Sequence, residues 1–187
     1  MANGGRPRIA GRPAAPNLFR RWYAAKSPVF QFALKFGALI LAAYLVLLLP
    51  LCTGVTSASV EAYARLASVI LNCLGEHTHA TDATIWSAHT AITVSPACSA
   101  LRYIWFFCAA VIAFPVAAGR KVLGILLGSA LLYGLNLIRV TSLFYIGAHF
   151  GRFFDMVHEQ LWGLVLIVAE VSLCVLWVNL ARREGRS

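Results

Sequence analysis

Charged side chains are scarce in this chain: they make up 12% of its 187 residues, while 60% of the residues are hydrophobic. A soluble domain usually has about a quarter charged residues and about half apolar ones. The apolar residues also gather in runs that are longer than any element of a soluble core requires. This shortage of charge excludes an ordinary soluble domain and predicts an all-α integral membrane protein.

Acidic residues are the scarcer charged type, with 7 against 16 basic ones and a net charge of +9. An excess of positive charge can indicate nucleic-acid binding, but here the basic residues flank the apolar runs instead of forming one basic face. They cluster in residues 6–26, 120–121 and 182–186. Such clusters are typical of cytoplasmic loops. We therefore predict no nucleic-acid partner and a multi-pass protein of the plasma (inner) membrane with both termini in the cytoplasm.

No small-residue cleavage site follows the first apolar run, so we interpret this run as an uncleaved span and not as a signal peptide. The charge clusters and apolar runs together predict four spans, at about residues 28–49, 96–118, 122–150 and 158–180. They form one membrane domain, 28–183, between basic cytoplasmic tails at 1–27 and 184–187. Pro28 suits the first turn of the first span.

The segment between the first two spans, residues 50–95, is expected on the outer face. Residues 61–74 have an amphipathic pattern that predicts a helix at the membrane interface. Its apolar face is formed by Ala62, Leu66, Val69, Ile70 and Cys73. After Gly75, alternating polar and Thr, Ile or Val residues predict a short hairpin or loop cap.

Cys98 is the first residue with chemical potential. Ser95 and Pro96 suit the cap and first position of a helix, which places Cys98 in the first turn of the second span. Unpaired N–H groups there favour a thiolate, and Arg102, four residues on, adds a positive charge on the same face. The alternative is a small apolar residue that only packs at a helix start.

Arg139 lies inside an apolar run, where an arginine costs about 2.5–3.5 kcal/mol at the centre of a span and is usually paired or functional. It follows Val122 by 17 residues, or about 25 Å of helix, which brings it to the outer level of Cys98. Asn136 lies one turn away and is expected to orient the guanidinium. The alternative is an arginine that extends to the outer headgroups.

His158, followed by Glu159, begins the fourth span on the same side, although a polar helix cap would have the same pattern. The predicted topology therefore brings Cys98, Arg139 and His158 to one layer. A thiolate nucleophile, an imidazole for proton transfer and a guanidinium for an oxyanion are the groups that acyl transfer needs. We predict these three as catalytic residues, with Arg102, Asn136 and Glu159 in support.

Three segments carry a resemblance to a known family. PACSALR (96–102), NLIRV (136–140) and HEQLWG (158–163) resemble the motif blocks of the exosortase/archaeosortase family, in the same order and spacing. In that family, a Cys, an Arg and a His form the active site. Ala100 departs from the pattern, because a glycine usually follows Cys-Ser there. In length, the chain is similar to the compact exosortase H subtype.

The resemblance implies a membrane-embedded cysteine protease or transpeptidase. Such an enzyme cleaves the C-terminal sorting signal of an exported protein through a thioester acyl-enzyme and passes the protein to an acceptor. The signal consists of a short motif, a hydrophobic helix and a basic tail, so a protein with such an end is the expected partner. No metal or cofactor is expected.

Two other functions stay open on the sequence alone. A membrane thiol-disulfide oxidoreductase would also use outer cysteines, but it would want a C-x-x-C pair, which this sequence lacks. A non-catalytic scaffold or transporter subunit would use Arg139 and Glu170 as path residues. Mutation of Cys98 separates these alternatives from a transpeptidase.

Several further residues have weaker patterns. Cys52 and Cys73 face the oxidising side and could form a disulfide. Cys108 and Cys174 are interpreted as packing residues, and Glu170 is expected to bond Tyr133, Ser129 or a backbone carbonyl. The outer loop has a group that could bind a metal ion but that we interpret as a solvated loop: His77, His79, His89 and Asp82.

Overall fold

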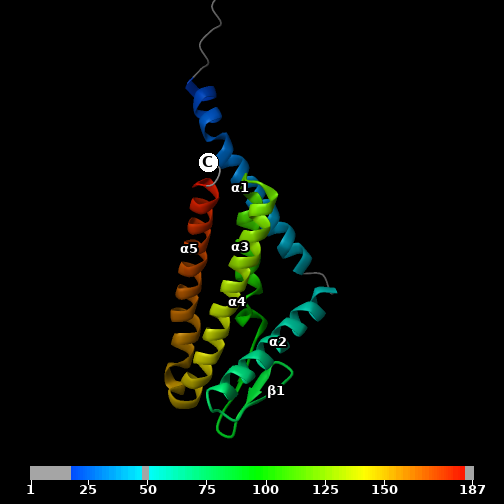
Figure 1. Cartoon of the computed structure of the whole chain (residues 1–187), viewed down its shortest axis with the longest axis vertical. Coiled ribbons are helices and arrows are strands. Elements are labelled where there is room, and N and C mark those ends of the chain that lie inside the picture. The colour runs from blue at the N-terminus through cyan, green and yellow to red at the C-terminus, as the bar shows by residue number, and fades with distance from the viewer. Residues whose placement is uncertain (1–17, 48–50, 184–187) are drawn as a thin grey trace, which may run out of the picture.

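In the computed structural model, which describes residues 18–47 and 51–183, helices dominate the chain and a small sheet covers one end (Figure 1). The helices are α1 (Leu18–Leu47), α2 (Leu51–Cys73), α3 (Leu101–Ala113), α4 (Ala118–His149) and α5 (Trp162–Arg183). The strands are β1 (His79–Thr81), β2 (Thr84–Trp86) and β3 (Ala91–Thr93). Most of the predicted tails at 1–27 and 184–187 lie outside the described residues.

Three of the described helices are long and apolar enough to cross a membrane: Ser27–Val46 of α1, all of α4, and Met156–Arg183, which contains α5. A hydrocarbon layer of about 30 Å needs about 20 helical residues, so each can span it. The prediction of an all-α membrane protein is confirmed. The placement of Pro28 in a first helical turn is wrong, because α1 begins at Leu18 and Pro28 lies inside it. Membrane helices tolerate such internal prolines.

The predicted span at 96–118 is realised by a shorter helix. α3 has 13 residues, or about 20 Å of helix. It begins only at Leu101 because Ser99 is extended, and it ends at Ala113 because Phe114 is extended and precedes Pro115. A residue before proline is disfavoured in the helical region. The extended Ser99 on one side and the Phe114-Pro115 pair on the other therefore make this helix shorter than hydropathy alone predicted.

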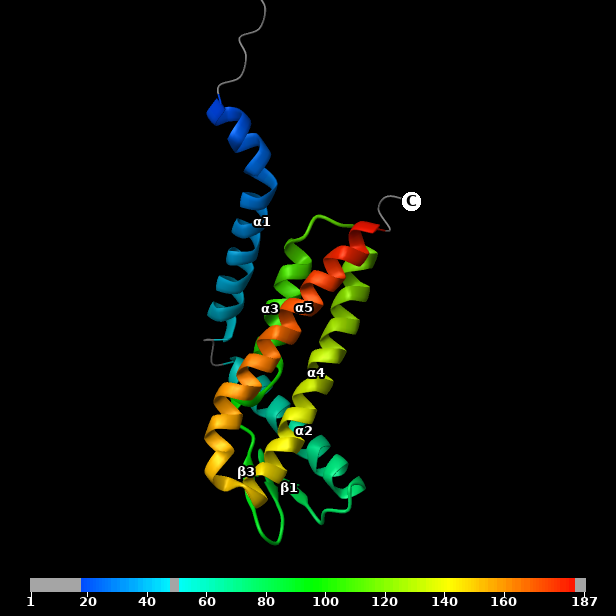
Figure 2. The same cartoon turned by 90° about the vertical axis from the view of Figure 1, so that its left-hand side faces the viewer.

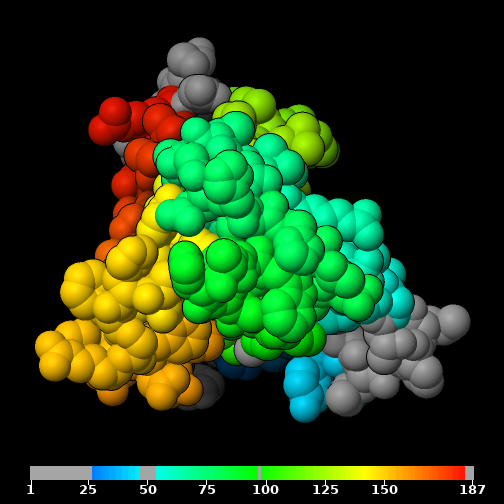
Figure 3. Space-filling view, turned by 90° about the horizontal axis from the view of Figure 1, so that it is seen from below, coloured from blue at the N-terminus to red at the C-terminus, as the bar shows by residue number. Residues whose placement is uncertain are grey.

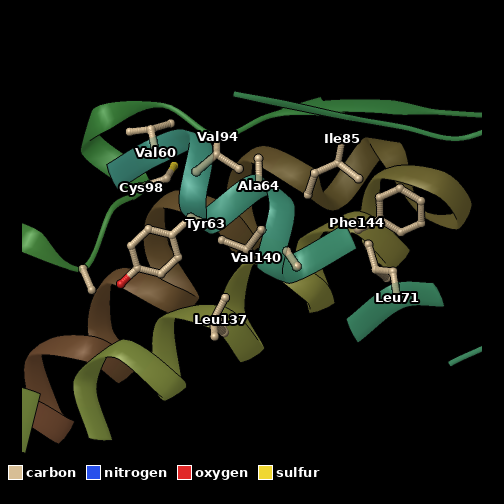
Figure 4. Close-up of a cluster of buried hydrophobic side chains, with 12 residues drawn as sticks. Val60, Tyr63, Ala64, Leu71, Ile85, Val94, Cys98, Leu137, Val140 and Phe144 are labelled. Atoms are coloured by element: carbon tan, nitrogen blue, oxygen red, sulfur yellow. The ribbon is translucent and has the colours of Figure 1, made fainter. Parts of the chain in front are cut away.

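The amphipathic helix of the outer segment is present, but its buried face differs from the prediction. α2 begins ten residues earlier than expected and buries Val60, Tyr63, Ala64, Ala67 and Leu71. Of the predicted face, Leu66 and Val69 are exposed. Both faces are apolar, so hydropathy could not choose between them. The small side chains of Ala64 and Ala67 allow close packing of this face. Figure 4 shows Tyr63 and Ala64 among the buried side chains of the cluster.

The predicted hairpin or cap is a three-stranded antiparallel sheet in the order β1-β2-β3. Its register pairs Ile85 of β2 with Ala80 on one side and Ile92 on the other. Ile85 is fully buried in the cluster with α2 and α4, which anchors the sheet on the helices. The sheet matters for the site because its last strand leads, through Val94, directly to Pro96 and Cys98.

Helices α1, α3, α4 and α5 run along the long axis of the molecule, and both views agree on their ends (Figures 1 and 2). The start of α1, the α3–α4 turn and the end of α5 lie at one end, which we call the basic end. α2 and the sheet lie at the other, the capped end (Figure 3). The positively charged segments thus share one end, as the predicted topology requires. The assignment of this end to the cytoplasm stays a prediction.

Candidate active site

Cys98 lies at the capped end, in a single 3₁₀ turn formed by Pro96–Cys98. Its N–H donates to the carbonyl of Ser95 at 2.8 Å, and the residue is 8% exposed. The prediction that Cys98 belongs to the first turn of a membrane helix is wrong, because α3 begins three residues later. Ser95 precedes this short turn, but its side chain makes no cap hydrogen bond: its hydroxyl donates to the Cys98 Sγ at 3.3 Å. The Cys98 sulfur therefore accepts a hydrogen bond from the Ser95 hydroxyl, where the sequence predicts stabilisation by a helix N-terminus.

His158 contacts the thiol directly, with Nε2 2.8 Å from the Cys98 Sγ. It lies in η3 (Met156–Leu161), a π-helical segment that leads into α5. Segments of this kind are rare and occur often at functional sites, because they displace side chains from the regular helical positions. The ring of Phe154 stacks on the imidazole, with 5.6 Å between the two ring centroids. His158 thus contacts both the thiol and an aromatic ring, which a polar helix cap would not require.

Arg139 approaches the same sulfur from α4. The residue is 5% exposed, and its Nη2 lies 3.9 Å from the Cys98 Sγ and 3.4 Å from the carbonyl of His158, to which it donates. Among the described residues, its Nε and Nη1 have no hydrogen-bond partner. The alternative of an arginine that extends to the headgroups does not fit this burial. The guanidinium instead presents two donors beside a thiol.

Asn136 lies one turn before Arg139 on α4 and is fully buried. The sequence suggested that it orients the guanidinium, but its Nδ2 donates to the carbonyl of Cys98 at 2.9 Å. Asn136 therefore holds the backbone of the 3₁₀ turn. One face of α4 supplies both the cation near the sulfur and the bond that positions the cysteine.

Two predicted supporting residues are not brought to the thiol. Arg102 is exposed and contacts its neighbour Tyr103, at 3.4 Å from the hydroxyl and 5.2 Å from the ring centroid. It was expected near Cys98 on the assumption of one helix through both residues, and the break at Ser99 removes that geometry. Glu159 is exposed, and no hydrogen bond joins it to Cys98 within the described residues.

The remaining cysteines do not form the disulfide considered above. Cys52 and Cys73 lie near opposite ends of one helix, 21 residues or about 31 Å apart, and a disulfide requires Cα atoms within about 7 Å. The Cys52 side chain lies outside the described part, while Cys73, Cys98, Cys108 and Cys174 are free. Ser129 is one of the partners expected for Glu170, but its hydroxyl contacts the Cys108 Sγ at 3.8 Å. Glu170 itself is half-buried. Within residues 18–47 and 51–183, no three His, Cys, Asp or Glu residues form a metal-binding group.

Sequence reasoning missed two residues of this site. Ser95 was interpreted only as a helix cap, and Phe154 was not considered. The signal for Phe154 is its spacing: it precedes His158 by four residues, which are neighbouring positions on a helix surface. Neither role is evident without knowing that the turn of Cys98 and the start of α5 meet.

The fold and the site together define a membrane helix bundle with a thiol, an imidazole and a guanidinium in contact near one end. Comparison with protein families matches residues 22–178 to the transmembrane exosortases (Exosortase_EpsH). The chain therefore belongs to the transmembrane exosortase family, whose membership supports a membrane transpeptidase or sorting role. The matched model is that of the EpsH form, and it does not test the compact exosortase H subtype, which stays a prediction. No curated protein and no solved structure matches the chain.

Proposed function

We propose that this chain is a cysteine transpeptidase that cleaves the C-terminal sorting signal of exported proteins and transfers the protein to an acceptor nucleophile. The observation that supports this most is the contact of 2.8 Å between the Cys98 Sγ and the His158 Nε2, with the Arg139 Nη2 3.9 Å from the same sulfur. This contact joins a nucleophile to a base at hydrogen-bond distance, which is the arrangement required for nucleophilic catalysis.

In the first step, the thiol proton passes to the His158 Nε2, and the Cys98 sulfur attacks the carbonyl carbon of the peptide bond. The new C–S bond turns the carbonyl oxygen into an oxyanion. Arg139 offers donors at Nε and Nη1 for that oxyanion, in a site nearly without solvent, where such hydrogen bonds are strong. Ser95 stabilises the thiolate before attack through its hydroxyl.

In the second step, the C–N bond breaks and His158 gives its proton to the leaving amine, so a thioester remains on Cys98. His158 then takes a proton from the acceptor nucleophile, which attacks the thioester carbonyl. The bond to sulfur breaks, and the proton returns through His158 to Cys98. At the end of the cycle, Cys98 is again a thiol and His158 is again neutral.

A groove next to the thiol supports a membrane-embedded substrate segment. It lies between α1 and α3, has a volume of about 720 Å³ and is lined mainly by apolar side chains such as Ile40, Leu41 and Trp105. Pro96 and Ser99, which flank Cys98 closely, also line it. A hydrophobic helix of a sorting signal placed here would have its preceding motif near the sulfur.

The test uses the full-length protein co-expressed with a protein from the same genome that ends in a short motif, an apolar helix and a basic tail. We expect a covalent adduct on Cys98 that hydroxylamine releases, as it does a thioester. Cys108→Ala is the control and should retain processing, because Cys108 contacts Ser129 of α4 and not His158. Signal cleavage by Cys98→Ala protein would contradict the proposal.

A further inference from the structure

Two apolar clefts meet at one arginine of the basic end. The first, of about 220 Å³, lies between α4 and α5, and the second, of about 610 Å³, lies between α1, the α3–α4 turn and α5. Arg120 and Ala181 line both clefts. Arg120 is 19 residues from Arg139 along α4, or about 28 Å, so this junction is separate from the thiol site.

The arginines at this junction are held in place by the fold. Arg120 donates from Nη1 to the carbonyl of Ala181 at 3.1 Å, which links the start of α4 to the end of α5. Arg182 lies over the ring of Phe114, 5.3 Å from its centroid, along the second cleft. The first cleft is bounded by the indole of Trp177, which lies directly against Gly124. Arg120 and Arg182 therefore both lie beside the apolar side chains that line the clefts.

The junction is strongly positive. Arg120, Lys121, Arg182 and Arg183 lie at the ends of α4 and α5 that meet there. Among residues 18–47 and 51–183, acidic side chains lie in α2, the outer segment, the segment before α5, and at Glu170 in mid-helix. Glu184 follows Arg183 outside the described part. An anion at the junction would offset a charge of several units at the rim of the bundle.

We propose that this junction binds an anionic diacyl phospholipid, with the phosphate on Arg120 and Arg182 and one acyl chain in each cleft. Basic pockets between membrane helices are suited to acidic lipid headgroups, and the planar guanidinium matches phosphate geometry. Two clefts that diverge from one charged point fit a ligand with two chains and one headgroup. A peptide helix with a basic tail is disfavoured here, because its charge has the same sign as the junction.

Trp177 provides a direct readout, because its indole lines the first cleft. The full-length protein, with its other tryptophans replaced by phenylalanine, is placed in nanodiscs of phosphatidylcholine. A minor fraction of brominated phosphatidylglycerol or, in a parallel sample, brominated phosphatidylcholine is then added. We expect the anionic lipid to quench Trp177 more strongly at the same mole fraction. Arg120→Gln and Arg182→Gln should each weaken this preference about fivefold, the effect of one basic residue near an anionic surface.

The matched control is Arg152→Gln, because Arg152 is also an exposed arginine over an aromatic ring, 4.5 Å from the centroid of Phe153, but lies at the capped end. It should leave the preference unchanged. Equal quenching by the two lipids, or an equal loss in Arg152→Gln, would overturn the proposal. So would displacement of the lipid by inorganic phosphate, which would identify a free anion as the ligand. If the single-tryptophan protein does not fold, native mass spectrometry of the unmodified chain and of Arg182→Gln makes the same comparison by counting retained lipid.

Discussion

At the capped end, Cys98, Arg139 and Asn136 are each less than a tenth exposed, whereas Leu123 and Leu127 near the basic end are more than half exposed. The capped end packs α2, the sheet and the ends of three helices around polar groups. The basic end leaves apolar clefts between the helices. Buried polar groups are costly unless they are satisfied, and two donors of Arg139 have no partner among the described residues, so burial here is typical of a functional site and not of packing for stability. The clefts of the basic end suit an apolar ligand, which is the basis of the lipid site proposed above.

The sharpest way to break this comparison is to remove the thiol. Cys98→Ala should leave folded protein in the membrane and abolish signal processing, because no other described cysteine contacts His158. Cys108→Ala and Cys174→Ala should each retain activity. Processing of a cognate substrate, followed by the size of its product, measures this. Activity in Cys98→Ala would move the chemistry away from the capped end.

The next largest effect is expected for Arg139→Lys. A lysine keeps the charge but lacks the planar fork of donors. If Arg139 binds the oxyanion, processing should fall by about 10²–10³-fold, the usual loss when one such donor is removed. The rate of processing under single-turnover conditions measures this, with membrane insertion as the control for folding. A near-native rate would reduce Arg139 to a structural cation.

At the other half of the bundle, the expected effect is on stability. A side chain at Gly128 of α4 would collide with the ring of Phe107, which is buried, so Gly128→Ala should destabilise the protein by about 1–3 kcal/mol. Gly134 lies on the same helix with open space around it, and Gly134→Ala should instead stabilise the helix by about 0.5–1 kcal/mol. Unfolding in mild detergent compares the two variants. Equal changes would show that packing between α3 and α4 is loose.

The smallest effect separates two roles of His158. If it forms an ion pair with Cys98 before substrate arrives, His158→Ala should slow alkylation of Cys98 at neutral pH by about tenfold or more, equivalent to about one pH unit. The other cysteines are replaced so that one thiol is followed across a pH series. If the alkylation profile stays in place while processing is lost, His158 acts only as the acid for the leaving amine.

The three central residues of the site could be predicted from the sequence, but the residues that position them could not. Cys98, Arg139 and His158 were predicted together because charge clusters placed three helix ends on one side. The structure brings all three into contact. The role predicted for Arg102 assumed that one helix runs through Cys98 and Arg102. The role predicted for Asn136 assumed a bond to Arg139 within α4, whereas Asn136 bonds the backbone of Cys98. The breaks at Ser99 and Phe114 shorten α3, and this changes which neighbours each residue meets.

The sequence by itself determined the membrane class of the protein, its long apolar helices, the location of its basic residues and the three residues of the candidate site. These follow from composition and local order, since lipid requires long apolar helices and excess charge must lie at their ends. Only the tertiary structure decided the buried face of α2, the bond from Asn136 to Cys98 and the meeting of two clefts at Arg120. These depend on which surfaces of separate helices come into contact, and apolar patterns on several faces of a membrane helix leave that choice open.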